Sequence, residues 1–193
     1  MTKVNAYEKI LKVAEGLIQT QGYNAFSYRD IATQIGIKTS SIHYHFPTKA
    51  DLAKAVVKNH ISSLSINLED LINDKTKTCC QKLTAFFDAI FAATYAYDSR
   101  MCLGGMLASD VLTLPESIQH EVREFFRRIE DWLRRLLNQG VESKEYHLNI
   151  DVTLEITMIL SSLEGALLLA RLYQDDLRLA QVKEAIIARL SRA

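Results

Sequence analysis

The chain is poor in the residues that interrupt regular structure, with 7 Gly and 2 Pro among 193 residues. This scarcity argues against a turn-rich β architecture and against a disordered chain. Hydrophobic residues make up 48% of the sequence, enough to build a sizeable core. The long uninterrupted segments that remain have mostly helical spacing, which predicts an all-α protein.

Cysteine is also scarce. Cys79 and Cys80 are adjacent, Cys102 stands apart, and no Cys-x-x-Cys occurs. This pattern is not the disulfide framework of a small secreted domain. The N-terminus lacks the apolar core of a signal peptide. We therefore expect a cytoplasmic protein with reduced thiols, and no motif indicates a cofactor.

Net charge is absent overall but unevenly distributed. Residues 1–60 carry a formal charge of +4, and the remainder carries −4. A basic segment in a neutral chain is a mild indication of nucleic acid as a partner.

Apolar periodicity divides the chain into about nine helices. We expect a helix-turn-helix domain over residues 1–48 and a helical ligand-binding and dimerisation domain over residues 49–193. The expected helical segments are 5–21, 28–35, 39–45, 49–73, 78–97, 115–140, 151–173 and 176–192, with a short irregular piece at 101–110. Within that piece, Gly104-Gly105 is expected to act as a hinge or as a point of close packing.

The segment 151–173 is apolar on nearly every side. It also contains Asp151, Glu155, Glu164 and Arg171, whereas a membrane span has about 20 predominantly apolar residues with few charges. A helix that is hydrophobic all round must be covered all round. We expect a second copy of the chain to provide the cover, giving a homodimer through residues 151–192; the alternative is a central helix buried within one chain.

A helix, a turn centred on Gly36 and a second short helix have the layout of a helix-turn-helix. On the second helix, Ile42 and Phe46 are four residues apart and should point to the core. The opposite face carries Thr39, Ser40, His43 and Tyr44 and no acid. Small hydroxyl, imidazole and phenol groups without carboxylates suit contact with phosphates and base edges.

This stretch allows three other interpretations. His43 and His45 suggest a metal pair, but residues two apart on a helix point in roughly opposite directions, so we expect no metal site. Ser and His side chains suggest a hydrolase, but there is no nucleophile elbow, and we expect neither catalytic residues nor an enzyme. The remaining alternative is a polar face that is simply solvated.

The stretch "FSYRDIATQIGIKTSSIHYHFPTKADLAKAV" resembles the DNA-binding motif of the TetR family of transcriptional regulators. The match covers roughly residues 6–57 and includes the pair Ile31-Ala32, Gly36, and the run from Ser40 to Leu52. One departure is His43, where the family most often has Tyr.

This resemblance implies contacts to double-stranded operator DNA. Thr39, Ser40 and His43 are implied to read bases, and Arg29 to reach a base or a phosphate. The implied phosphate contacts are Ser27, Ser41, Tyr44, His45 and Lys49. It also implies dimerisation through the last two helices and an inducer pocket among the middle helices.

The stretch "MCLGGML" contains a Cys followed closely by Gly, which resembles a branch of the family that includes electrophile and oxidant sensors. Cys102 is then either a modifiable sensor or a small buried hydrophobe. Six residues are expected to line a pocket for a small apolar effector: Phe91, Tyr95, Cys102, Met106, Phe125 and Ile129.

The sequence thus predicts a one-component regulator, most simply a repressor that binds a palindromic operator as a dimer. Release would follow binding of a small apolar effector or modification of Cys102. The alternative is a helix-turn-helix regulator without a small ligand, controlled by a protein partner.

Overall fold

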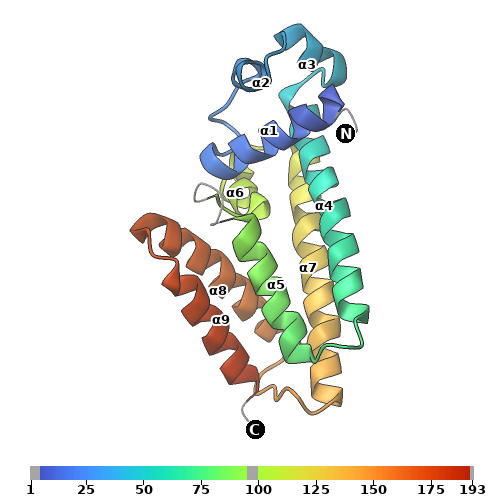
Figure 1. Ribbon diagram of the computed structural model, residues 1–193, viewed down its shortest axis with the longest axis vertical. Coiled ribbons are helices and arrows are strands. Elements are labelled where there is room, and N and C mark those ends of the chain that lie inside the picture. Colours follow the sequence, from blue (N-terminus) through green and yellow to red (C-terminus); the bar gives the residue numbers. More distant parts are fainter. Residues whose placement is uncertain (1–4, 95–99, 192–193) are drawn as a thin grey trace. The chain divides into compact units, whose positions relative to one another are not determined.

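A computed structural model of the chain describes residues 5–94 and 100–191 (Figure 1). Within these residues the chain forms nine α-helices and one 3-10 turn, and no strand. The helices are α1 Ala6–Gln21, α2 Tyr28–Ile35, α3 Thr39–His45, α4 Lys49–Asn73, α5 Cys79–Ala93, α6 Leu103–Ser109, α7 Glu116–Glu142, α8 Val152–Tyr173 and α9 Leu177–Leu190, with the 3-10 turn η1 at Val111–Thr113. The all-α prediction is confirmed.

The described residues form two compact units. The first contains the described parts of Met1–Ser62 together with Leu103–Phe126, and the second contains those of Ser63–Cys102 and Arg127–Ala193. The first unit therefore extends beyond the boundary that we expected after residue 48, because α6 and the start of α7 pack with α1–α3 in one core. The functional boundary at residue 48 stays a prediction.

The core of the first unit is built from apolar faces of six helices. Ile42 of α3 and Leu52 of α4 are fully buried, and Phe46 between them is 3% exposed. The other members with the least exposure are Ile10, Ala14, Ile18, Ile31, Ala53, Leu107 and Ile118. The inward orientation expected for Ile42 and Phe46 is confirmed, so one face of α3 is anchored in this core.

The segment expected to be irregular over 101–110 is helical from Leu103 to Ser109, so that expectation was wrong. Gly104 accounts for the difference, because it lies against the ring of Phe125. A Cβ at Gly104 would come within 2.3 Å of Phe125 Cε1. Gly104 is therefore a point of close packing rather than a hinge.

Gly104→Ala is expected to lower the free energy of unfolding by about 1–3 kcal/mol, because the Phe125 ring has to move in a packed core. Gly165→Ala is the matched control, since no neighbouring atom lies within 4 Å of its added Cβ. That control should be neutral or slightly stabilising, as alanine is the better helix former. Urea unfolding of both variants measures the difference, and equal stabilities would contradict the packing role of Gly104.

In the second unit, α5 and α7 contribute an aromatic cluster. The ring of Trp132 lies 4.9 Å from that of Phe86, centroid to centroid, and its indole N–H donates to the Leu68 carbonyl at 2.8 Å. This buried hydrogen bond joins α7 to α4 within the unit. It satisfies the one polar group of the indole.

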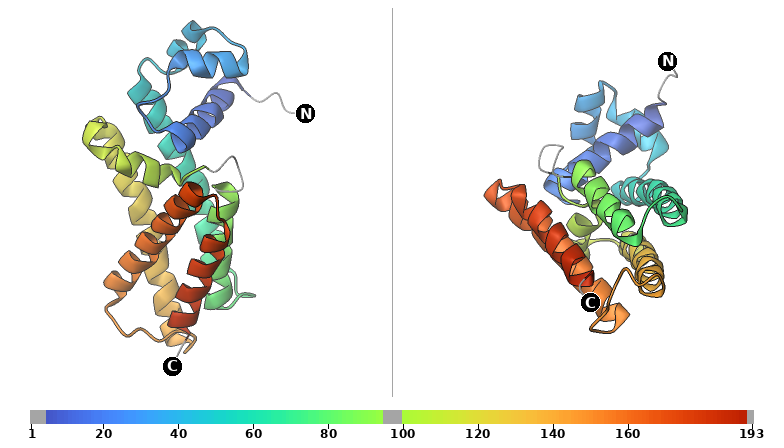
Figure 2. Two further views of the ribbon diagram at one scale, coloured as in Figure 1. Left: turned by 90° about the vertical axis from the view of Figure 1, so that its left-hand side faces the viewer. Right: turned by 60° about the horizontal axis from the view of Figure 1, so that its bottom comes forward.

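Helices α8 and α9 pack side by side in opposite directions (Figures 1 and 2). Glu155 of α8 is only 1% exposed, and its carboxylate accepts two hydrogen bonds from the Arg189 guanidinium of α9, one of them at 2.6 Å. A second ion pair, Lys183 to Asp88 at 2.6 Å, joins α9 to α5.

Much of the apolar surface of α8 is uncovered within the chain. The large side chains that remain exposed on α8 and at the start of α9 are Leu154, Met158, Leu168, Leu169, Leu172, Tyr173 and Leu177. A central helix buried within one chain is therefore contradicted. By length and composition alone α8 could cross a membrane, a test that the apolar helices of soluble proteins also pass.

Candidate nucleic-acid interface

The start of α2 is fixed by Ser27 and Asp30. The Asp30 carboxylate accepts hydrogen bonds from the Ser27 N–H and the Ser27 hydroxyl, both at 2.7 Å. These bonds hold the pKa of Asp30 below its ordinary value. The carboxylate reaches back to the N-cap as expected for a capping box.

At the other end of α2, Gly36 adopts left-handed angles, with φ 70° and ψ 38°. No atom lies within 4 Å of the position that its Cβ would occupy. Glycine is therefore needed here for its left-handed backbone angles and not for close packing. These angles turn the chain toward α3.

Asp30→Asn is expected to destabilise the protein at neutral pH and to have little effect in acid. The folded-state pKa of Asp30 is lowered, so its contribution is present above the ordinary pKa of about 4 and is lost as the pH falls through the lowered value. Thermal unfolding of both proteins from pH 7 to acid tests this. A difference in stability that did not narrow toward low pH would contradict it.

The solvent-facing side of α3 carries no acid. Thr39, Ser40, Ser41 and His43 are exposed, and Tyr44 is 84% exposed, while Ile42 from the same helix is fully buried. A tyrosine held out in water by a short helix with a buried anchor is unusual, because aromatic side chains usually bury their rings. Five of the six predicted contacts on α3 are therefore accessible to solvent, and the sixth, His45, is half-buried.

Two contacts orient the His43 ring. Its ring lies 4.7 Å from the Tyr28 ring in an edge-on arrangement, and its Nδ1 lies 3.4 Å from the Pro47 carbonyl oxygen. The Tyr28 hydroxyl in turn donates to the Phe46 carbonyl at 2.8 Å. Burial, followed by the nearby Asp51 charge, raises the pKa of Tyr28 to about 12, so this hydroxyl keeps its proton.

The other predicted contacts differ in their exposure to solvent. Ser27 and Arg29 are exposed at the first turn of α2. His45 is half-buried, with its ring 5.9 Å from Tyr7 and 5.1 Å from Tyr44. It therefore supports Tyr44 as well as offering its own nitrogen atoms.

Lys49 is turned toward the protein. Its ammonium donates to the Phe26 carbonyl and lies 4.2 Å from the centre of the Phe26 ring and 4.9 Å from that of Tyr23. Burial lowers the pKa of this ammonium. Lys49 thus fastens the start of α4 to the segment between α1 and α2, a structural role that the sequence did not indicate.

Two residues were missed by the sequence interpretation. Tyr28 positions the His43 ring, and Lys38 is an exposed base at the N-cap of α3. The place of Lys38 immediately before Thr39 was a usable signal, since a base there adds positive charge beside the exposed surface of α3. The role of Tyr28 depends on a contact between residues 15 positions apart, which no local pattern reveals.

The expected effector residues are divided between the two units. Phe91, Cys102 and Ile129 belong to the second unit, Met106 and Phe125 belong to the first, and Tyr95 lies outside the described residues. Phe125 is buried against Gly104 and lies 5.6 Å from the His60 ring, centroid to centroid. The predicted pocket stays a prediction.

Cys102 is 9% exposed and bonds to the side chain of Glu164 on α8. Burial raises the pKa of Glu164, which favours the neutral carboxylic acid. This arrangement is compatible with both interpretations of Cys102, because a buried thiol beside an acid can be packing or a protected sensor.

The chain matches two family models. Residues 10–56 match bacterial regulatory proteins of the tetR family, and residues 79–186 match the tetracyclin repressor-like C-terminal domain. The first match contains α2, the turn at Gly36 and α3.

Similar proteins are known in sequence and in structure. The crystal structure of a TetR transcriptional regulator from Legionella pneumophila is 45% identical, superposes with a TM-score of 0.92, and covers 98% of this chain and 100% of its own. The nucleoid occlusion factor SlmA of Photobacterium profundum is 24% identical, with 86% of this chain and 83% of that protein covered. The transcriptional repressor KstR2 of Mycobacterium tuberculosis is 25% identical, covering 76% of this chain and 72% of its own. The chain therefore belongs to the TetR family and is a helix-turn-helix transcriptional regulator rather than an enzyme.

Proposed function

We propose that the protein is a cytoplasmic, homodimeric transcriptional repressor that binds a palindromic operator through α2 and α3. The observation that carries this proposal is the surface of α3, where five polar or aromatic side chains without an acid stand exposed on a buried anchor. A simply solvated helix gives no reason to hold Tyr44 in water at 84% exposure.

The proposed contacts follow the positions of the side chains. Thr39, Ser40 and His43 read base edges in the major groove, and Arg29 reaches a base or a phosphate from α2. Phosphate contacts come from Ser27, Ser41, Tyr44 and His45. Lys49 stands behind them as a positive charge at the start of α4, while its ammonium keeps the Phe26 carbonyl as its partner.

Dimerisation is proposed through the exposed apolar side chains of α8 and α9. Seven large hydrophobic side chains there are more than 40% exposed, and a two-fold copy of the same surface would cover them. Two α3 helices can then meet half-sites about 34–36 Å apart along one side of the DNA.

Release is proposed to follow a small apolar effector or modification of Cys102. Either event must favour a state in which the two α3 helices no longer match the half-site spacing. The contact between Cys102 and Glu164 supports this role, because a substituent on the sulfur would have to displace the buried carboxyl. Cys102→Ser should abolish release by an electrophile if modification is the signal, and unchanged release would remove Cys102 from the mechanism.

Selection of bound duplexes from random DNA tests the proposed function. The wild-type protein should enrich a two-fold symmetric sequence. Ser40→Asp, which adds an acid to the exposed surface of α3, should abolish this enrichment. Ser62→Asp, the same change at an exposed position of α4 in the same unit, should preserve it. No enriched sequence, or equal enrichment by both variants, would overturn the proposal.

A further inference from the structure

Two adjacent thiols open α5. Cys79 is the first residue of the helix and is 6% exposed, Cys80 follows and is half-buried, and both thiols are free. Thr78 and Gln81 form a capping box that fixes this first turn, with bonds of 2.9 and 3.1 Å. The two cysteines are therefore held in a defined backbone conformation, with their Cα atoms about 3.8 Å apart.

A buried hydroxyl without a partner lies beside them. Tyr146 is 5% exposed, and its Oη is buried and makes no hydrogen bond. Its pKa is raised by burial first and then by the charges of Cys80 and Cys79, which act on the phenol through space. Its neighbour in sequence, Glu145, accepts a hydrogen bond from the Cys80 N–H, which brings this loop to the start of α5. An unsatisfied buried hydroxyl is costly, and this one remains available to a group bound at the thiols.

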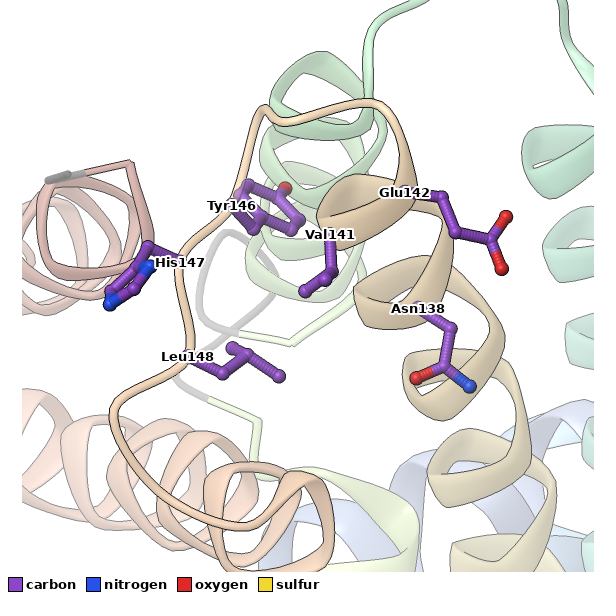
Figure 3. A pocket seen from close by; sticks show the side chains of 6 residues that line it. All are labelled: Asn138, Val141, Glu142, Tyr146, His147 and Leu148. Carbon is purple, nitrogen blue, oxygen red and sulfur yellow. The ribbon is translucent and has the colours of Figure 1, made fainter.

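The position of the Tyr146 ring is set by Gly140. A Cβ at Gly140 would come within 2.0 Å of a carbon of this ring. The ring also lines a groove of about 430 Å³ at the end of α7, together with Asn138, Val141, Glu142, His147 and Leu148 (Figure 3). Tyr146 thus lines solvent-accessible space, and the neighbouring Glu145 contacts the start of α5, all within the second unit.

Two further side chains complete the cluster. Glu145 accepts a hydrogen bond from the Cys80 N–H at 3.2 Å, and both Glu145 and Ser143 bond to the side chain of Cys79. Burial, followed by the Glu145 charge, raises the pKa of Cys79. The thiol therefore stays protonated at neutral pH, which makes it a poor nucleophile toward reagents that need a thiolate.

The two thiol sulfur atoms of Cys79 and Cys80 determine which kind of ligand can bind here. Among the described residues, no group of three or more His, Cys, Asp or Glu side chains is placed to hold a metal ion. A trivalent arsenic atom that carries one organic group needs only two sulfur atoms and reacts with protonated thiols. We propose that Cys79 and Cys80, with Tyr146 and Glu145 beside them, form a covalent binding site for trivalent organoarsenicals.

The reaction exchanges oxygen for sulfur without a change of oxidation state. An organoarsenic dihydroxide loses two As–O bonds and gains two As–S bonds, and each thiol proton leaves with a departing hydroxide as water. Glu145 accepts the proton in transit from the thiol, and the Tyr146 hydroxyl donates a hydrogen bond to the departing oxygen. This site is separate from operator binding and does not depend on it.

Intact-mass measurement of the reduced full-length protein with phenylarsine oxide tests the proposal. One phenylarsenic group should add to each chain, with loss of one water relative to the oxide. Excess ethane-1,2-dithiol should remove it, and a monothiol at the same thiol concentration should not, because two protein sulfur atoms hold the arsenic.

Variants that each lack one of the three cysteines locate the adduct. Cys79→Ser and Cys80→Ser should each weaken binding by about a hundredfold or more, because the second As–S bond forms within one molecule. Cys102→Ser keeps the pair and should bind like the wild-type protein. Helical circular dichroism verifies that each variant is folded. No adduct on the wild-type protein, an adduct that persists in Cys80→Ser, or one that requires Cys102 would overturn the proposal.

Discussion

Leu168→Glu is expected to give a folded monomer that no longer binds operator DNA. Leu168 is 57% exposed on α8 among other uncovered apolar side chains. A carboxylate there would lose its hydration in the proposed two-fold interface, where each chain would bring one. Because the proposed dimer binds two half-sites together, the monomer should bind about 10²- to 10⁴-fold more weakly than the dimer.

Sedimentation velocity and gel retardation measure the two effects on the same samples. Leu112→Glu is the matched control, because Leu112 is a leucine that is 97% exposed in η1, and it should leave the dimer and its DNA binding intact. A Leu168→Glu protein that remained a dimer would show that this part of α8 lies outside the interface. A monomer that retained full affinity would refute the requirement for two copies.

Arg189→Ala is expected to lower the free energy of unfolding markedly. It leaves the Glu155 carboxylate, which is 1% exposed, without its guanidinium partner. The Arg189 side chain is itself 39% exposed, so the pair is only partly buried. Leaving the buried Glu155 carboxylate without this partner should cost about 1–3 kcal/mol.

Arg135→Ala provides the comparison. Arg135 pairs with Glu69 at 2.7 Å, but the two side chains are 47% and 54% exposed. Water replaces such a partner, so the loss should be about 0.2–1 kcal/mol. Urea unfolding of both variants at one protein concentration measures the two losses. Equal losses of unfolding free energy in the two variants would show that the burial of Glu155 does not strengthen its ion pair with Arg189.

The ends of the helices were predictable because they depend on neighbours in sequence. Thr48 and Asp51 bond reciprocally at the start of α4, as Ser27 and Asp30 do at the start of α2. Gly36 takes the left-handed conformation that ends α2. Capping groups act over three or four residues, so their positions in the sequence are sufficient to recognise them.

The features that were missed depend on contacts between distant residues. Gly104 and its neighbour predicted an interruption from their low helix propensity, yet α6 forms because Phe125 packs on Gly104. Lys49 was expected to face phosphate, yet the Phe26 carbonyl and two aromatic rings hold its ammonium. Propensity and family position describe where a residue stands along the chain, and they do not reveal which partners the fold brings to it.

The salt dependence of operator affinity tests the central claim most directly, since that claim is recognition of duplex DNA by α2 and α3. The logarithm of the association constant should fall linearly with the logarithm of the salt concentration, because each neutralised phosphate releases condensed counterions. A dimer that makes about 6–10 phosphate contacts should lose about 10³- to 10⁵-fold in affinity between 50 and 200 mM salt. An affinity that stayed flat over this range would contradict the proposed interface.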